Sequence, residues 1–210
     1  MPRICVVGAG RWGQNHVRTL SELGHLAALV DSNSETLSSF RDKYNGLSTH
    51  LTLDDALAVG YDGFVVATPA VTHHKIASAI LATGTPALVE KPLALTVPDA
   101  QSLVDLAAHH NTNLMVGHLL LFHPAILKIK ELIDEGMLGK LQYIYSNRLN
   151  LGTVRTEENI LWSFAPHDIS IFHFLLGTSP ISVESKGAAF LQPGVQDSTM
   201  TTLMYPDNVM

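Results

Sequence analysis

The sequence predicts an α/β protein with two domains. A doubly wound parallel sheet is expected over residues 1–120, and an α+β domain with an open, mostly antiparallel sheet over residues 121–210. Short apolar runs alternate with helix-compatible stretches through the first domain, which indicates parallel strands joined by helices. Three glycines spaced G-x-G-x-x-G follow the first run. After about residue 120, side chains of two kinds alternate along longer segments, which is typical of antiparallel strands.

The first strand, turn and helix carry a dinucleotide-binding pattern. Residues 4–7 form an apolar, β-branched run that suits a buried parallel strand, and a helix is expected over residues 11–23. Gly8 allows the chain to reverse, Gly10 lets a pyrophosphate approach the backbone, and Gly13 lets the helix pack against the sheet. The pattern predicts a Rossmann fold whose cofactor contacts also include Arg11 and Trp12.

The second strand ends in an acidic residue that indicates the cofactor. Residues 26–30 are apolar, and Asp31 follows them. A carboxylate at this place accepts hydrogen bonds from the adenosine ribose and repels a ribose phosphate, so NAD is favoured over NADP. Ser32 is expected to cap the next helix and to lie beside the cofactor. The alternative is a glycine turn with a solvated Asp at a strand end.

The remaining elements of this domain place more polar residues at strand ends. Strands are expected at 48–51, 63–67, 86–90 and 114–117, and helices at 33–43, 54–59, 73–83 and 97–110. Ligands of doubly wound sheets bind beyond the carboxyl ends of the strands. The cofactor candidates that follow these strands are Thr68, Pro69, Glu90, Lys91 and His118. A cis peptide bond before Pro92 would change the direction of Lys91.

The second domain has fewer elements. Helices are expected at 125–135 and 167–176, and strands at 140–149, 181–190 and 198–205. The chain ends just after the last of these strands, so the sheet is expected to have an unpaired edge.

Composition excludes several classes of protein. The formal net charge is −6 and there is no basic run, so nucleic acid and anionic membranes are unlikely partners. No apolar run is long enough to cross a bilayer. Because the N-terminus leads directly into the first expected strand, no signal peptide is expected. The only cysteine, Cys5, lies inside the first strand. A cytoplasmic protein without disulfide bonds is expected. Metal-binding motifs such as H-E-x-x-H are absent, so no metal is predicted.

Three motifs make the sequence similar to a known family. They are Glu90-Lys91-Pro92 after a strand, the upstream Ala67-Thr68-Pro69, and His167-Asp168-Ile169. Together they resemble the glucose–fructose oxidoreductase, inositol dehydrogenase and MocA family, and the resemblance covers essentially the whole chain. It implies a nicotinamide-dependent sugar or cyclitol dehydrogenase, with Lys91 and His167 as catalytic residues and His73 beside the cofactor. The family usually has Asp four residues before the catalytic His, where this chain has Ser163.

The segment from Ser146 to His167 is similar to one branch of this family. That branch oxidises C3 of UDP-N-acetylglucosaminuronic acid in the biosynthesis of surface polysaccharides. The resemblance implies a sugar or nucleotide-sugar substrate and a homo-oligomer formed through the open sheet. A carboxylate on the substrate needs cations or amide donors. The candidates for substrate binding, besides Lys91 and His167, are Arg148, Asn150, Arg155 and Asn159.

Several alternatives stay open at this stage. The chain could oxidise an inositol or a free sugar, or it could be a non-catalytic dinucleotide-binding sensor or remnant. Lys91 could be a surface lysine, and His167 a capping or core histidine. Asp168 could orient His167 or act as a charge at the start of a helix. His118 could contact the substrate or nicotinamide, or it could serve packing.

Overall fold

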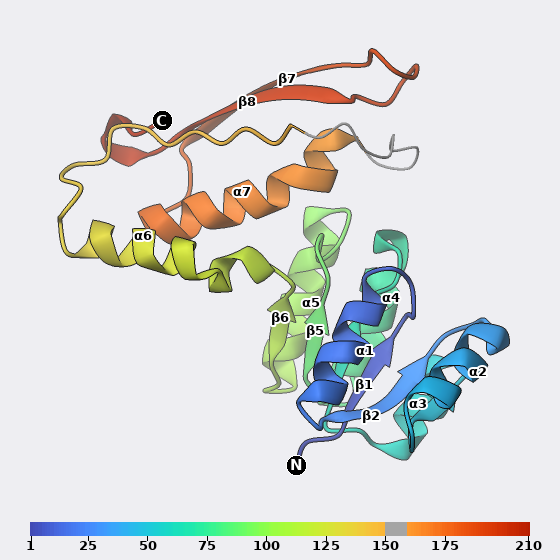
Figure 1. Ribbon diagram of the computed structural model, residues 1–210. Helices are drawn as coiled ribbons and strands as arrows, with labels where there is room; N and C mark the ends of the chain where they lie inside the picture. The colour runs from blue at the N-terminus through green and yellow to red at the C-terminus, as the bar shows by residue number, and fades with distance from the viewer. Residues whose placement is uncertain (150–158) are drawn as a thin grey trace. The chain divides into compact units, whose positions relative to one another are not determined.

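The computed structural model describes residues 1–149 and 159–210, which form two units, Met1–Gly117 and His118–Met210 (Figure 1). The division lies within three residues of the expected domain boundary at 120. Each unit has its own sheet, so each is described by itself.

The first unit contains a six-stranded sheet. Its strands are β1 (Ile4–Val7), β2 (Leu26–Val30), β3 (Ser48–His50), β4 (Gly63–Val66), β5 (Ala87–Val89) and β6 (Leu114–Val116). All neighbours pair in parallel, in the order β3-β2-β1-β4-β5-β6. The order reverses beside β1, where the chain crosses from β3 to β4. This is the switch point at which doubly wound sheets bind their ligands. The predicted fold class is confirmed.

Helices cover both faces of this sheet and create two apolar cores. The helices are α1 (Gly13–Glu22), α2 (Ser34–Lys43), α3 (Leu53–Val59), α4 (Ala70–Leu81) and α5 (Val97–His109). Side chains alternate between the faces of a strand, so Val6 and Val7 enter different cores. Val6 packs with Leu29 of β2, whereas Val7 packs with Ile80 of α4. The apolar runs of the sequence are thus buried on both sides, as parallel strands require.

The starts of α2 and α4 show how the sequence prediction and the structure differ at helix ends. Asn33, not Ser32, caps α2, because its side chain accepts hydrogen bonds from the backbone N–H groups of Glu35 and Thr36. Helix α4 begins at Ala70, directly after Pro69, so His73 lies one turn inside the helix. Pro69 has φ −58° and an extended ψ of 141°, so it lies just before the helix and not within it.

The second unit has a different architecture. It contains a short 3₁₀-helix η1 (Leu119–Phe122), helices α6 (Pro124–Asp134) and α7 (Ile160–Leu176), strands β7 (Ser182–Ala188) and β8 (Ser198–Met204), and a second 3₁₀-helix η2 (Pro206–Asn208). Strands β7 and β8 pair antiparallel over their full lengths. The predicted α+β character with an antiparallel sheet is therefore confirmed.

The strand expected at 140–149 is not formed in the described residues. Two backbone hydrogen bonds join this segment to the end of the chain: the N–H of Ile144 donates to the carbonyl of Met210, and the N–H of Met210 donates to the carbonyl of Gln142. Among the described residues, the segment has no neighbouring strand. A strand needs a row of hydrogen bonds to a neighbour, and alternation in the sequence does not supply that neighbour.

Helix α7 begins seven residues earlier than predicted. Pro166, which precedes the predicted helix 167–176, lies inside the observed one. A proline inside a helix lacks the N–H that would bond to the carbonyl four residues before it, so α7 has one hydrogen bond fewer at Pro166. Asp168 consequently lies in the middle of α7, so the alternative that it acts as a charge at a helix start is wrong.

Neither membrane spans nor metal clusters were found in residues 1–149 and 159–210. The helices there are too short or too polar to cross a bilayer. The same residues contain no group of three or more His, Cys, Asp or Glu side chains placed to hold a metal ion.

Because Cys5 lies in the core, we predict that its thiol is unreactive in the native protein. Its side chain is fully buried in β1, and burial raises the pKa of the thiol to about 12. Since the thiolate is the reactive species, the native protein should not react with a thiol reagent at mildly alkaline pH. Ellman's reagent should detect one thiol in urea and essentially none in buffer. Rapid stoichiometric reaction in buffer would contradict the described core.

Candidate active site

The loop from Gly8 to Gly13, here called the glycine loop, brings α1 close to β1. Residues with a Cβ atom would not fit at Gly8 or Gly13. A Cβ atom at Gly13 would lie 1.9 Å from the carbonyl oxygen of Gly8. Gly8 itself has φ +97°, and a Cβ there would lie 2.8 Å from the carbonyl oxygen of Ala67. Both glycines are therefore required by the backbone. At Gly10 a Cβ would meet no protein atom within 4 Å, so this side of the loop is open to a ligand.

The first turn of α1 suits a phosphate. Trp12 is the N-cap residue of α1, and its side chain makes no capping hydrogen bond. The described first turn of the helix contains no acidic residue. The N–H groups at the start of a helix have no partner within the helix and carry the positive end of its dipole. Phosphates bind readily to such an end. The N–H groups of Gln14 and Asn15 bond to the carbonyl oxygens of Gly10 and Trp12 at 3.1 and 2.9 Å. The open side of Gly10 and the positive end of the helix dipole are therefore the features that fit the pyrophosphate of a dinucleotide.

Asp31 is fixed against the same loop. Its Oδ2 accepts a hydrogen bond from the backbone N–H of Ala9 at 2.8 Å, and its Oδ1 accepts one from Asn33 at 2.9 Å. A carboxylate has about four acceptor positions, so these two bonds leave capacity for ribose hydroxyls. The placement fits the adenosine ribose of NAD.

The loops after β4 and β5 are joined by His73. This side chain is 1% exposed; its Nδ1 lies 2.8 Å from the carbonyl oxygen of Pro92, and its Nε2 lies 2.8 Å from that of Thr68. Both ring nitrogens thus face backbone carbonyls. Thr68 also exchanges a hydrogen bond of 2.7 Å with Thr72, at the start of α4. The contacts of His73 support a role in holding the two loops together, while its predicted contact with the cofactor stays a prediction.

Glu90 follows β5 and is 7% exposed. Its Oε1 accepts hydrogen bonds from the indole of Trp12 and from Nε2 of His16, the latter at 2.8 Å, and its Oε2 accepts one of 3.2 Å from the backbone N–H of Lys91. Burial raises the pKa of this carboxyl, but the hydrogen bonds from His16 and Trp12, the charge of His16 and the Lys91 N–H outweigh it. The pKa of Glu90 is therefore lowered, and the group is ionised at neutral pH.

Sequence reasoning missed His16. The residue lies on α1 four positions after Trp12, so both side chains are on one face of the helix. This spacing was a usable signal, but its partner Glu90 is 74 residues away in the sequence. Lys91 was expected to change direction at Pro92, and the Lys91–Pro92 peptide bond is cis.

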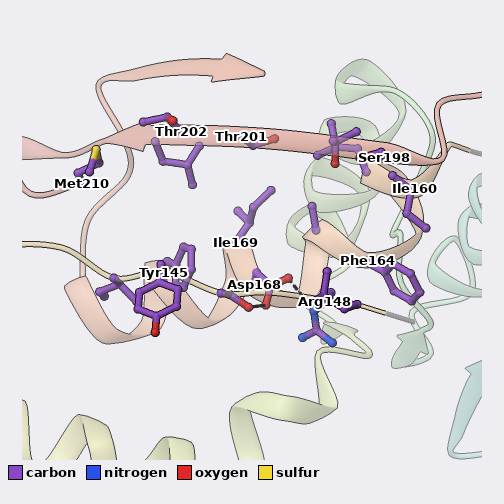
Figure 2. Close-up of a pocket in the computed structure, with 18 of the residues that line it drawn as sticks. Tyr145, Arg148, Ile160, Phe164, Asp168, Ile169, Ser198, Thr201, Thr202 and Met210 are labelled. Atoms are coloured by element: carbon purple, nitrogen blue, oxygen red, sulfur yellow. Dashed lines mark hydrogen bonds and ion pairs between the residues drawn. The ribbon is translucent and has the colours of Figure 1, made fainter. Parts of the chain in front are cut away.

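A second candidate region lies within the unit His118–Met210. It is a cavity of about 570 Å³ between β8, α7 and the extended segment that carries Tyr145 and Arg148 (Figure 2). Most side chains around it are apolar, including Ile160, Phe164 and Ile169.

An ion pair lies at the edge of this cavity, as Figure 2 shows. Nε of Arg148 donates a hydrogen bond of 2.6 Å to Oδ2 of Asp168, and Oγ of Ser146 donates one of 2.8 Å to Oδ1. Asp168 therefore fixes the predicted substrate residue Arg148. These contacts favour that role over the orientation of the adjacent His167.

The other predicted substrate residues of this unit are placed on α7 or lie outside the described residues. Oδ1 of Asn159 accepts a hydrogen bond of 3.1 Å from the backbone N–H of Trp162, so Asn159 caps the helix. His167 lies in the helix, four residues after Ser163, which is 2% exposed. His118 precedes η1. Asn150 and Arg155 are not among the described residues.

Comparison with known sequences identifies the family. The sequence profile described as "Oxidoreductase family, NAD-binding Rossmann fold" matches residues 2–118, and the profile of the GFO/IDH/MocA C-terminal domain matches residues 126–210. The chain belongs to the GFO/IDH/MocA oxidoreductase family. The resemblance found in the sequence motifs is confirmed, and so is NAD as the cofactor of the Rossmann domain.

Curated relatives have several activities. The chain is 34% identical over 145 residues to the rhizopine catabolism protein MocA of Rhizobium meliloti, covering 68% of this chain and 45% of that protein. It is 26% identical over 188 residues to the UDP-N-acetylglucosamine 3-dehydrogenase of Acidithiobacillus ferrooxidans, covering 89% of this chain and 58% of the relative. The chain thus spans about half the length of these two curated relatives.

Solved structures share the fold. GnnA, the UDP-N-acetylglucosamine 3-dehydrogenase from Acidithiobacillus ferrooxidans, has a TM-score of 0.88 and 24% identity, and the match covers 99% of this chain and 64% of GnnA. The WlbA dehydrogenase from Bordetella pertussis, solved with NADH and UDP-GlcNAcA, has a TM-score of 0.85 and 23% identity, covering 99% and 68%.

The position of Asp31 predicts how the protein chooses its cofactor. In Asp31→Asn the side chain keeps its shape but loses its charge, so its hydrogen bonds to ribose hydroxyls weaken. The affinity for NAD should fall about 10-fold, and that for NADP should rise relative to NAD because repulsion of the ribose phosphate is removed. Calorimetric titration with both cofactors measures this change. Asp62→Asn, at the opposite edge of the sheet, is the control. An unchanged NAD/NADP ratio would refute the role of Asp31.

The contacts of Glu90 predict a pH-dependent contribution to stability. Because folding lowers its pKa, the contribution is present above the usual Glu pKa of about 4.3 and is lost as the pH falls through the folded value. Glu90→Gln should reduce the free energy of unfolding by about 1–3 kcal/mol at pH 7. The difference from the wild type should narrow at pH 3. Urea denaturation at both pH values measures it, with the exposed Glu22→Gln as control. A difference that does not depend on pH would show that charge is not involved.

Proposed function

We propose that the protein is an NAD-dependent dehydrogenase that oxidises a secondary alcohol of a sugar or nucleotide sugar. The observation that carries the proposal is the position of Lys91, directly after β5 at the same sheet edge as the glycine loop and Asp31. Parallel strands end together at this edge, so a dinucleotide held by the loop and Asp31 extends its other end toward β4 and β5. We expect Lys91 to lie beside the nicotinamide of such a dinucleotide.

The proposed reaction assigns one proton and one hydride. When bound, NAD supplies the acceptor for the hydride of the carbinol C–H bond. Lys91 in its neutral form accepts the hydroxyl proton at Nζ, which leaves a carbonyl on the substrate. A positioned acid–base group of this kind typically contributes a factor of ~10²–10⁴ to the rate. His167 is the second acid–base candidate, because imidazole exchanges protons near neutral pH.

The proposed substrate is a UDP-N-acetyl-hexuronic acid oxidised at C3. Support comes from the two relatives that are named for UDP-N-acetylglucosamine oxidation and for a complex with UDP-GlcNAcA. The chemistry of Arg148 also supports a uronic acid substrate. Its Nε is bonded to Asp168, but the guanidinium has further N–H groups that can bind the carboxylate of the substrate. Asn159, Asn150 and Arg155 remain candidates for the same task. We also propose a cytoplasmic location and a homo-oligomer formed through the open sheet.

Two other functions have specific support. Relatives named as inositol dehydrogenases are similarly close, at 26% identity over 215 residues for one from Streptomyces leeuwenhoekii, so a cyclitol or free sugar is a second candidate substrate. A non-catalytic NAD-binding protein is the third candidate. Its support is Ser163, which is buried on α7 where the family usually has Asp.

A substrate panel tests these functions together. Purified protein is mixed with NAD and UDP-sugars, UDP-uronic acids, inositols and free sugars, and NADH formation is measured by absorbance. Turnover selective for a UDP-N-acetyl-uronic acid supports the proposal, whereas turnover on an inositol or free sugar moves the substrate to that class. NADH binding without turnover on any compound would favour the non-catalytic alternative.

Lys91 gives the sharpest test of the mechanism. Lys91→Met keeps the aliphatic stem but removes the amine, so turnover on the active substrate should fall at least ~100-fold. The affinity for NADH should stay within about threefold, because the loop and Asp31 hold the cofactor. Steady-state kinetics and NADH titration measure the two effects. Lys75→Met, on the exposed side of α4, should behave like the wild type. Normal turnover of Lys91→Met would exclude Lys91 as the base.

A further inference from the structure

The Glu90 carboxylate connects the glycine loop to the catalytic lysine. It follows β5, yet it accepts hydrogen bonds from Trp12, at the end of the glycine loop, and from His16 on α1. Its other oxygen accepts the backbone N–H of Lys91. One side chain therefore joins three parts of the first unit that the dinucleotide is expected to contact.

The space around Glu90 restricts it to this arrangement. A Cβ atom at Gly117, after β6, would lie 2.9 Å from the Glu90 carboxyl carbon, so the carboxylate packs directly against the Gly117 backbone. The Glu90 side chain is 9% exposed and that of His16 is 23% exposed. A buried carboxylate is costly unless charged or polar donors satisfy it. Without His16, Oε1 of Glu90 would lose its donor from α1, and Trp12 alone would remain on that oxygen.

We infer that His16 is a positioning residue for the nicotinamide half of the cofactor site. It holds the Glu90 carboxylate between α1 and β6, and Glu90 in turn holds the backbone of Lys91. His16 acts through Glu90 and needs no contact with the cofactor. The inference concerns cofactor binding by the Rossmann domain, so it does not depend on which substrate the protein oxidises.

The strand order assigns His16 to one half of the cofactor. Asp31 follows β2, on one side of β1, and Glu90 follows β5, on the other side. The adenosine half of a dinucleotide lies on the β2 side, so the nicotinamide half extends toward β5. Loss of the His16–Glu90 bond should therefore affect ligands that contain nicotinamide and spare ADP, which carries the adenosine and diphosphate alone.

The test compares NADH and ADP binding to His16 variants by calorimetry. In His16→Leu, which removes the donor, the NADH dissociation constant should rise about 10-fold, because the Glu90 carboxylate and the Lys91 backbone then spend less time in the binding-competent arrangement. The ADP dissociation constant should stay within about twofold. In His16→Gln the amide nitrogen can replace Nε2 as donor, so NADH binding should return to within about threefold of the wild type. His25→Leu, just before β2 and so at the opposite end of the strands from Glu90, is the matched control.

Two outcomes would overturn the inference. Equal weakening of NADH and ADP by His16→Leu would mean that His16 only stabilises α1 and the fold. Unchanged NADH binding would mean that the Glu90 contact has no part in the cofactor site. Failure of the substrate panel would not bear on either outcome, since both ligands are measured without turnover.

Discussion

The close contact between α1 and β1 is the constraint on which the cofactor site depends. Gly13 lies so near the Gly8 carbonyl that no other residue fits, and this contact fixes where α1 begins. The positive end of the α1 dipole then lies at the switch point beside β1, where doubly wound sheets bind their ligands. The same placement brings Trp12 and His16 to Glu90, beyond β5. A glycine contact in the first strand–helix unit thus determines both the phosphate site and the surroundings of Lys91.

The first unit was largely predictable from its sequence because local patterns determine it. Its strands are short apolar runs buried on both faces, and glycines or polar residues end them, so their order along the chain and their parallel pairing could be inferred. The errors concern helix starts, where neighbouring polar residues compete to cap: Asn33 caps α2 although Ser32 was expected to. The His16–Glu90 bond was missed for another reason. It joins residues 74 positions apart, and no local pattern reveals such a contact.

The second unit was less predictable because its elements depend on neighbours. Residues 140–149 alternate like a strand, but the described chain offers them a partner only at Met210. Helix α7 continues through Pro166, which sequence rules treat as a probable break. The ion pair between Arg148 and Asp168 joins residues 20 positions apart in the sequence, and no local pattern reveals such a contact. The conformation of residues 140–149, the start of α7 and the Arg148–Asp168 ion pair depend on contacts between distant residues, which local sequence patterns do not indicate.

A crystal structure of the protein with NADH tests the central claim most directly. The account predicts the adenosine ribose on Asp31, the diphosphate at the first turn of α1 above Gly10, and the nicotinamide beside Glu90 and Lys91. A dinucleotide bound elsewhere, or bound with its nicotinamide directed away from β5, would contradict both the assigned site and the proposed role of Lys91.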